Sequence, residues 1–262
     1  MKYLFIHQNF PGQFRHLAPA LAAQPGNQVV ALMVQPKGEP QNWRGVRVLP
    51  YPLQGANTPG LHPWLVDIET KTLRATACWQ AARSLRNQGF VPDVIVAHPG
   101  WGEPLFVKQV WPRARLGLYA EFFYQLDGAD VGFDPEFAPP DPEADACRLQ
   151  MKNLNHLAHL DQADGALSPT HWQASTFPPA WRDRICVAHD GIDTDMLCPV
   201  PDGRFPLPGG SGELTRDDEV ITYVARNLEP YRGFHVFMRA LPDLLRERPK
   251  AQVLLVGGEE TG

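Results

Sequence analysis

The stretch YLFIHQNFPGQFRHLAPALAAQPGNQVVALMV, residues 3–34, decides the fold. It opens with a short apolar run, residues 3–6, which is typical of a strand buried on both faces of a parallel sheet. A loop containing Gly12 follows, and the apolar residues after it recur at the spacing of one helix face: Phe14, Leu17, Ala18 and Leu21. A second apolar run covers residues 28–34. Strand, glycine-containing loop, helix and strand in this order predict the start of a doubly wound α/β domain.

The same alternation continues through residues 1–198. Further strand-like apolar runs follow the opening unit at 45–49, 92–98, 115–121, 165–168 and 185–189. One long helical stretch ends near Asn87, and another runs from about Cys147 to about Asp164. The segment 128–145, rich in Asp, Pro and Phe, is expected to be an excursion loop. We therefore expect residues 1–198 to form one N-terminal domain.

Residues 199–219 are rich in proline, glycine and charged residues, which is typical of a linker. After them, a strand run at 220–225, a helical stretch at 233–247 and a strand run at 252–257 predict the start of a second α/β domain over 220–262. Roughly 40 residues are too few to bury a core alone. We therefore expect this second Rossmann-like domain to be truncated within the sequence.

The composition excludes several classes of protein. Of the 262 residues, 44% are hydrophobic and 20% are charged, and the net charge is −5, so neither disorder nor a basic nucleic-acid surface is indicated. No apolar run approaches the ~18 residues of a membrane-spanning helix, and the first ten residues lack the features of a signal peptide. The four cysteines are too far apart for a zinc ribbon. We expect a cytoplasmic protein with no metal and no nucleic-acid partner.

Open parallel sheets bind ligands beyond the carboxyl ends of their strands, so polar residues at those ends are the candidates for a site. These candidates are Asn9, Gly12, Gln13, His98, Gly100, Glu121, Ser168, Arg226 and Arg232. The sequence contains no motif for dinucleotide binding, P-loop phosphoryl transfer, acyl hydrolysis or zinc-dependent peptide hydrolysis.

Gly12 and His98 each allow two interpretations. Gly12 opens the first predicted helix, where free backbone N–H groups favour an anion, but a lone loop glycine also serves a plain tight turn. His98 ends a buried strand, where it can hydrogen-bond a sugar hydroxyl or exchange a proton near neutral pH. The alternative for His98 is a purely structural role.

The segment VARNLEPYRGF, residues 224–234, is the most specific element. Arg226 and Arg232 bracket a predicted strand-to-helix loop, and Gly233 stands at the helix start, where the helix dipole favours a negative ligand. One guanidinium group can donate two parallel hydrogen bonds to two oxygens of the same phosphate. The segment predicts a diphosphate site, and the alternative is two arginines on a solvated loop.

Together these features resemble the family-4 retaining glycosyltransferases, which have the GT-B fold. The family pattern is Gly-Arg, about five residues, Lys-Gly, an amphipathic helix and a strand that ends in glycine. Here Ala225 replaces the first glycine, Arg232 replaces the lysine, and Gly257 ends the strand. The segment AHDGIDT, residues 188–194, is similar to the family's Asn-Gly-Val-Asp, and the strand DVIVAH, residues 93–98, ends in a histidine as the family's does.

The resemblance implies a role for each matching residue. Arg226 and Arg232, with the backbone near Gly12, would bind the donor diphosphate, and His98, the catalytic candidate, would hydrogen-bond the transferred sugar. Further contacts to donor or acceptor would come from Asn9, Gln13, Gly100, Glu121 and Gly257. The family's Glu-x7-Glu segment, which holds the donor nucleotide and its sugar, would lie beyond residue 262, so most of the donor pocket is expected to be missing from this sequence.

The resemblance therefore implies a retaining, metal-independent glycosyltransferase that needs no cofactor besides its nucleoside-diphosphate sugar. The acceptor is an unidentified carbohydrate or lipid, and a peripheral membrane contact is left open. We expect the 262 residues alone to be inactive. Two alternatives stay open: a non-enzymatic remnant that binds a sugar or lipid acceptor, and a nucleotide-sugar epimerase of the same fold style.

Overall fold

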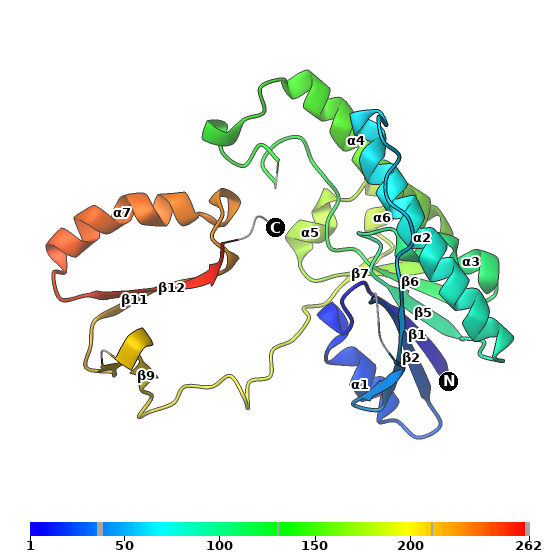
Figure 1. Cartoon of the computed structure of the whole chain (residues 1–262), viewed down its shortest axis with the longest axis horizontal. Helices are drawn as coiled ribbons and strands as arrows, with labels where there is room; N and C mark the ends of the chain where they lie inside the picture. Colours follow the sequence, from blue (N-terminus) through cyan, green and yellow to red (C-terminus); the bar gives the residue numbers. More distant parts are fainter. Residues whose placement is uncertain (36–38, 130, 211, 260–262) are drawn as a thin grey trace. The chain divides into compact units, whose positions relative to one another are not determined.

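A computed structural model describes residues 1–35, 39–129, 131–210 and 212–259. The chain divides into two compact units (Figure 1). Unit 1 consists of Met1–Gly132 and Phe137–Gly191, and unit 2 consists of Phe133–Glu136 and Ile192–Gly262. The expected domain and linker boundaries stay predictions. Residue 130 of the expected excursion loop, residue 211 of the expected linker and residues 260–262 of the expected second domain lie outside the described residues.

Unit 1 is built on an eight-stranded sheet with the strand order β3-β4-β2-β1-β5-β6-β7-β8. The strands are β1 Lys2–Ile6, β2 Gln28–Val34, β3 Gln41–Trp43, β4 Val46–Tyr51, β5 Val94–Ala97, β6 Arg115–Tyr119, β7 Gly165–Ser168 and β8 Ile185–Val187. Each neighbouring pair is parallel, except for the antiparallel pair of β3 and β4. The mostly parallel sheet confirms the predicted α/β class.

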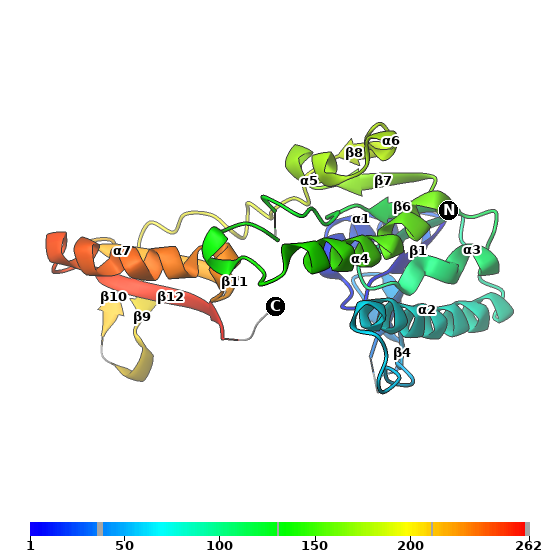
Figure 2. The same ribbon diagram turned by 90° about the horizontal axis from the view of Figure 1, so that it is seen from above.

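Helices cover both faces of this sheet, as a doubly wound fold requires (Figure 2). They are η1 Gly12–Phe14, α1 Leu17–Ala22, α2 Pro63–Asn87, η2 Glu103–Phe106, α3 Val107–Val110, α4 Pro142–Gln162, α5 His171–Thr176 and α6 Pro179–Arg182, with η marking 3-10 turns. A further 3-10 turn, η3 Pro135–Phe137, lies mostly in the segment Phe133–Glu136 of unit 2. Residues of α2, α3 and α4 share a core with Leu4 and Ile6 of β1, and residues of η1 and α1 share the opposite core with Phe5. Because side chains alternate along a strand, β1 contributes to two cores at once.

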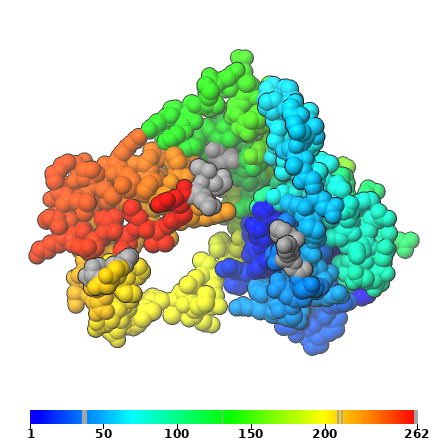
Figure 3. All heavy atoms as spheres, in the orientation of Figure 1, coloured from blue at the N-terminus to red at the C-terminus, as the bar shows by residue number. Residues whose placement is uncertain are grey.

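The long helices α2 and α4 each begin at a capped proline, but α4 begins at Pro142, so the predicted helix start near Cys147 is wrong and the last residues of the expected loop 128–145 are helical. Pro63 occupies the first position of α2, and the ring Nδ1 of His62 accepts a hydrogen bond from the Trp64 N–H at 3.2 Å. Asp141 caps α4 by accepting a hydrogen bond from the Ala144 N–H at 3.0 Å. The two helices contact each other, and their cyan and green surfaces adjoin in the space-filling view (Figure 3). Within the described ranges, no helix has the length and apolarity needed to span a bilayer.

Some predicted elements differ in extent from the observed ones. The helix predicted to begin at Phe14 begins at Leu17, because the Phe14 N–H bonds to the Pro11 carbonyl three residues back and closes the tighter turn η1. The strand predicted over 115–121 ends at Tyr119. The sequence analysis missed β3, α3, α5 and α6. Each of these has at most six residues, too few for a hydrophobic period to be recognised.

Unit 2 contains a strand, a helix and a strand in the predicted order. These are β11 Val220–Asn227, α7 Phe234–Glu247 and β12 Gln252–Gly258, and the two strands pair in parallel. The 3-10 turn η5 Pro230–Arg232 lies between β11 and α7. The expected linker contains structure of its own, because β9 Phe205–Pro206 and β10 Glu213–Leu214 form a small antiparallel pair there, flanking the 3-10 turn η4 Pro208–Gly210.

The segment Phe133–Glu136 belongs to unit 2 through its contacts with α7. The carboxylate of Asp134 lies 3.2 Å from the His235 Nε2, and Glu136 accepts two hydrogen bonds from Arg239, at 2.6 and 2.7 Å. Asp134, Glu136 and His235 offer possible metal-ligand atoms within 4.8 Å of one another. Since Arg239 already engages both oxygens of Glu136, we assign no metal to this cluster.

Two buried histidines of α4 make the stability of unit 1 depend on pH. Burial lowers the pKa of His156 to about 3 and that of His159 to about 4. Both are therefore neutral in the folded unit but take up protons below about pH 6.5 when it unfolds, so acid favours the unfolded state. From pH 7 to pH 5, each is expected to remove about 2 kcal/mol from the free energy of unfolding.

Urea unfolding at pH 7 and pH 5 tests this expectation, with tryptophan fluorescence as the probe because all seven tryptophans lie in unit 1. Between pH 7 and pH 5, the free energy of unfolding of the variant His156→Phe should fall by about 2 kcal/mol less than that of the wild type. An equal pH dependence in the two proteins would contradict the assignment, whatever their absolute stabilities.

Candidate active site at the carboxyl edge of the sheet

The strand order creates a crevice where the chain reverses its direction of progress across the sheet. From β1 the chain moves outward through β2 and β4 and then returns to β5 on the other side of β1. Ligands of open α/β sheets bind at such a switch point, beyond the carboxyl ends of the two strands. His7 directly follows β1 and His98 directly follows β5, and their ring centroids lie 5.5 Å apart.

A chain of hydrogen bonds joins these two histidines through Gln13 and Glu121. The Glu121 Oε2 lies 2.8 Å from the His98 Nε2, and its Oε1 accepts a bond from the Gln13 amide at 3.5 Å. The Gln13 Oε1 lies 2.8 Å from the His7 Nε2. The residues come from loops after β1, β5 and β6, so the sheet itself brings them together.

Backbone contacts define the tautomer of both rings. The Nδ1 of His98 accepts a hydrogen bond from the Gly100 N–H at 3.1 Å, and the Nδ1 of His7 accepts one from the Asn9 N–H at 3.0 Å. In each neutral ring the proton is therefore on Nε2. Both rings consequently donate, His98 to the Glu121 carboxylate and His7 to the Gln13 carbonyl oxygen.

Aromatic side chains fix the orientation of the His98 ring. Trp101 stacks on it at a centroid distance of 4.4 Å and an interplanar angle of 29°, and Tyr119 stacks at 5.5 Å and 28°. The Tyr119 hydroxyl in turn donates to the Asp190 carboxylate, 2.8 Å from each oxygen. With its neighbours packed in this way, the imidazole is held in one position.

The charge state of the site follows from burial and hydrogen bonding. Burial, together with the nearby His98, lowers the pKa of His7 to about 4, so His7 is neutral at pH 7. The hydrogen bond from His98 lowers the pKa of Glu121, which is therefore ionised. The Glu121 side chain is 42% exposed and that of His98 only 4%, so the carboxylate is the more accessible group.

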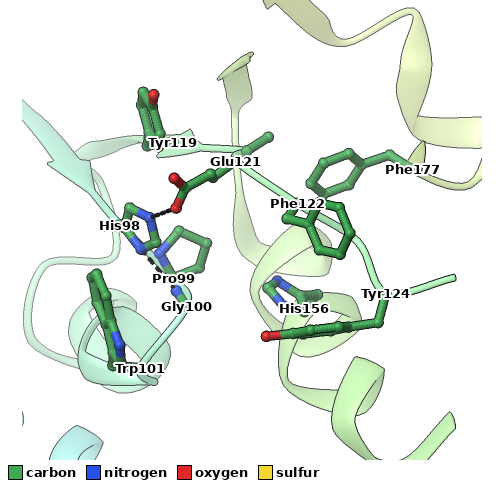
Figure 4. Close-up of a pocket in the computed structure, with 11 residues that line it drawn as sticks. His98, Pro99, Gly100, Trp101, Tyr119, Glu121, Phe122, Tyr124, His156 and Phe177 are labelled. Carbon is green, nitrogen blue, oxygen red and sulfur yellow. Dashed lines mark hydrogen bonds and ion pairs between the residues drawn. The ribbon is translucent and has the colours of Figure 1, made fainter. Parts of the chain in front are cut away.

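A cavity of about 120 Å³ opens next to this pair (Figure 4). Its lining consists of His98, Pro99, Gly100, Trp101, Tyr119, Ala120, Glu121, Phe122, Tyr124, His156 and Phe177. Figure 4 shows the His98–Glu121 pair on one side and the rings of Phe122, Tyr124 and Phe177 on the other. A carboxylate that faces aromatic rings suits a hydroxylated ring, because the hydroxyls find a hydrogen-bond acceptor and the apolar face of the ligand finds an aromatic surface.

The two glycines predicted at this site make room for the histidine rings. Gly12 has φ +45°, and a Cβ there would lie 2.4 Å from the ring of His7. A Cβ on Gly100 would lie 2.7 Å from the Cε1 of His98. Gly12 begins the turn η1 rather than a helix, so the predicted helix N-terminus at Gly12 is wrong.

The other predicted site residues, Arg226, Arg232 and Gly257, belong to unit 2. Arg226 lies in β11 rather than in the predicted loop, is exposed, and has no ion-pair partner within the part of the chain that the structure describes. Arg232 donates from Nε to the Glu229 carboxylate at 2.7 Å. Gly257 packs closely, because a Cβ there would lie 2.8 Å from the Leu228 Cδ2 and 3.0 Å from the Ala225 carbonyl oxygen.

Several residues of the site were absent from the sequence-based candidates. His7 carries the same signal as His98, since each directly follows a buried strand, and the strand-end rule could have found it. Trp101, Tyr119 and Asp190 carry no such signal, because Trp101 and Tyr119 act by stacking on His98 and Asp190 acts by accepting a hydrogen bond from Tyr119.

Replacing Gly12 is expected to disrupt the site more than its backbone conformation alone explains. Gly12→Ala combines a positive φ with a collision against the buried ring of His7, whereas Gly26→Ala has φ +83° and no atom within 4 Å. We expect Gly26→Ala to cost about 1 kcal/mol and Gly12→Ala roughly 2–3 kcal/mol more. Urea unfolding followed by tryptophan fluorescence measures both, and equal losses would show that the His7 ring does not limit this position.

Comparison with known proteins identifies a family that the sequence matches and solved structures with a similar fold. Residues 25–197 match the profile described as Glycosyl transferase family 4 group. D-inositol 3-phosphate glycosyltransferase from Streptomyces coelicolor is 30% identical over 89 residues, which are 29% of this chain and 20% of that protein. The chain thus matches only a fifth of the length of this relative.

Two solved structures show a similar fold. The catalytic domain of starch synthase IV from Arabidopsis thaliana, bound to ADP and acarbose, has a TM-score of 0.56 at 13% identity, over 98% of this chain and 68% of that one. A putative UDP-N-acetylglucosamine 2-epimerase from Listeria monocytogenes has a TM-score of 0.54 at 14% identity, over 97% and 62%. At these identities the likeness concerns the fold alone.

Proposed function

The chain belongs to the glycosyl transferase family 4 group, and from this membership we propose that the protein transfers a sugar from a nucleoside-diphosphate sugar to an acceptor. The observation that carries the proposal is the His98–Glu121 pair at the switch point of the sheet, beside a cavity with aromatic walls. This pair lies inside the matched residues 25–197.

In this proposal, His98 and Glu121 contact the transferred sugar. The ionised and accessible Glu121 accepts hydrogen bonds from sugar hydroxyls, while His98, held in one orientation by Trp101 and Tyr119, lines the cavity and donates a hydrogen bond to that carboxylate. Polar groups that are already held in place stabilise the charge that develops in the transition state, because they do not have to reorient during the reaction. Gln13 and Gly100 support the two groups, since Gln13 donates to Glu121 and Gly100 donates to His98.

Arg226 and Arg232 would bind the donor diphosphate in unit 2. Arg232 uses its Nε for Glu229, which holds the guanidinium in place and leaves Nη1 for a phosphate oxygen. The N-terminus of α7 follows directly at Phe234 and adds a positive dipole end. These positive groups would stabilise the leaving nucleoside diphosphate, which is why we propose a metal-independent transfer with no further cofactor. That the transfer retains the configuration of the sugar is proposed from the family resemblance alone.

The two alternatives make different predictions in an assay. An epimerase shares the fold, as the Listeria structure shows, but it would convert a sugar nucleotide into its epimer with no acceptor present. A transferase releases the nucleoside diphosphate in step with a new glycoside. A non-enzymatic remnant would bind saccharides or lipids and would not be stabilised by UDP, GDP or ADP in a thermal-shift measurement.

Arg226→Ala is expected to lower turnover at least 100-fold, because it removes a cation that is proposed to neutralise the leaving diphosphate. The control is Arg246→Ala, which removes an exposed arginine that pairs with Asp243, three residues earlier in α7. Release of nucleoside diphosphate by the protein from its complete reading frame measures both. Near-normal turnover in Arg226→Ala would contradict the donor assignment.

His98→Ala is expected to reduce turnover by 10²–10³-fold with a smaller effect on nucleoside-diphosphate binding, because His98 is proposed to contact the sugar rather than the leaving group. His171→Ala serves as the control, since His171 is an exposed histidine at the start of α5. Equal loss of nucleoside-diphosphate affinity and turnover in His98→Ala would argue for a merely structural role.

A further inference from the structure

The last residues of unit 1, 188–191, are bound to the sheet by two hydrogen bonds. The Ala188 N–H donates to the carbonyl oxygen of Ser168, the last residue of β7, at 3.0 Å. The hydroxyl of Tyr119, the last residue of β6, donates to the carboxylate of Asp190 and lies 2.8 Å from each of its oxygens. The chain leaves unit 1 at the residue after Asp190, so we call residues 188–191 the exit segment.

The bond between Tyr119 and Asp190 joins a buried donor to an exposed acceptor. Tyr119 is only 2% exposed, whereas Asp190 lies at the surface. Within the part of the chain that the structure describes, the Tyr119 hydroxyl has no other hydrogen-bond partner, so Asp190 supplies the acceptor that a buried hydroxyl requires. Burial, followed by this hydrogen bond, raises the pKa of Tyr119, so the hydroxyl stays protonated and remains the donor.

The ring of Tyr119 connects the exit segment with His98. It stacks on the imidazole at a centroid distance of 5.5 Å, and the ring of Phe14 meets it at 6.2 Å and an interplanar angle of 90°. Trp101 stacks on the imidazole at 4.4 Å and is itself contacted by the ring of His7 at 5.1 Å. Figure 4 shows His98 between Tyr119 and Trp101. The exit segment therefore supports one of the two rings that enclose the imidazole.

Loss of the Asp190 carboxylate would change the position of the Tyr119 ring. A buried hydroxyl without an acceptor is unfavourable, so the side chain would shift toward water or toward another partner. The ring would then no longer lie against His98 at its present angle of 28°. The rate of an enzyme depends steeply on such shifts, since a misplacement of about 1 Å can cost roughly 100-fold.

We infer that Asp190 is a positioning residue that acts through Tyr119. Its carboxylate holds the Tyr119 ring against the imidazole and so keeps His98 in the orientation in which it contacts the transferred sugar. This inference rests on the proposed function. It adds that the exit segment takes part in the reaction by supporting His98 rather than by binding substrate.

Single variants provide the first test, with nucleoside-diphosphate release by the protein from its complete reading frame as the measurement. Asp190→Ala and Tyr119→Phe remove the same hydrogen bond, and each is expected to lower kcat about tenfold while KM for the donor changes less than about threefold. Asp190→Asn keeps an acceptor oxygen and should retain at least about a third of the wild-type kcat. The matched control, Asp183→Ala, removes an exposed aspartate that follows α6 and should behave as the wild type.

Combined variants separate positioning from a merely structural role. The double variant of Tyr119→Phe and Asp190→Ala should be as active as either single variant, within about twofold, because both changes remove one bond. In the His98→Ala protein, adding Asp190→Ala should have no further effect. The inference is overturned by losses that multiply in the double variant, by a further tenfold loss in the His98→Ala background, or by unchanged turnover in Asp190→Ala.

The NMR signals of the His98 ring provide a readout that needs no turnover. The ring current of the stacked Tyr119 contributes to the shifts of the His98 Cε1–H and Cδ2–H protons, which His98→Ala assigns. These signals should move in Asp190→Ala, return toward their wild-type positions in Asp190→Asn and stay in place in Asp183→Ala. Unchanged signals in Asp190→Ala would overturn the inference even if turnover fell. If the wild type releases no nucleoside diphosphate, the proposed function fails, while this measurement still decides whether Asp190 positions His98.

Discussion

The parallel pairing of β1 with β5 is the constraint on which the site depends. Ile6 pairs with Ala97, so the next residue of each strand, His7 and His98, leaves the sheet at the same level. Their rings meet because the connections from β1 and β5 run in opposite directions across the sheet. Gln13, Trp101 and Glu121 then complete the hydrogen-bonded and stacked surroundings of the two rings.

Burying two imidazoles side by side has a cost that the surrounding groups offset. Burial and the nearby His98 lower the pKa of His7 to about 4, so His7 stays neutral at pH 7. The carboxylate of Glu121 receives hydrogen bonds from His98 and Gln13, so the buried donors are satisfied. Gly12 and Gly100 complete the arrangement by leaving the volume that the rings occupy.

One ring of the aromatic cavity wall, that of Tyr124, has different neighbours on its two sides. On its inner side, Tyr124 faces the space beside Glu121, and Lys152 lies over its ring. A single aromatic ring therefore contacts both the cavity and a cation. Asn153 holds the backbone of Tyr124 through two hydrogen bonds and so fixes the position of this ring.

Local patterns in the sequence determined the buried strands, the end of α2 at Asn87, the strand–helix–strand order of unit 2 and the family resemblance, because each signal lies within a few neighbouring residues. The same patterns identified His98, Glu121 and Gln13, since strand ends are recognisable. Only the tertiary structure decided that His7 contacts His98, that Tyr119 bonds to Asp190 71 residues away, and that Lys152 lies over Tyr124. Those contacts depend on strand order and on helices packing across the sheet, which hydrophobic period and local spacing do not encode.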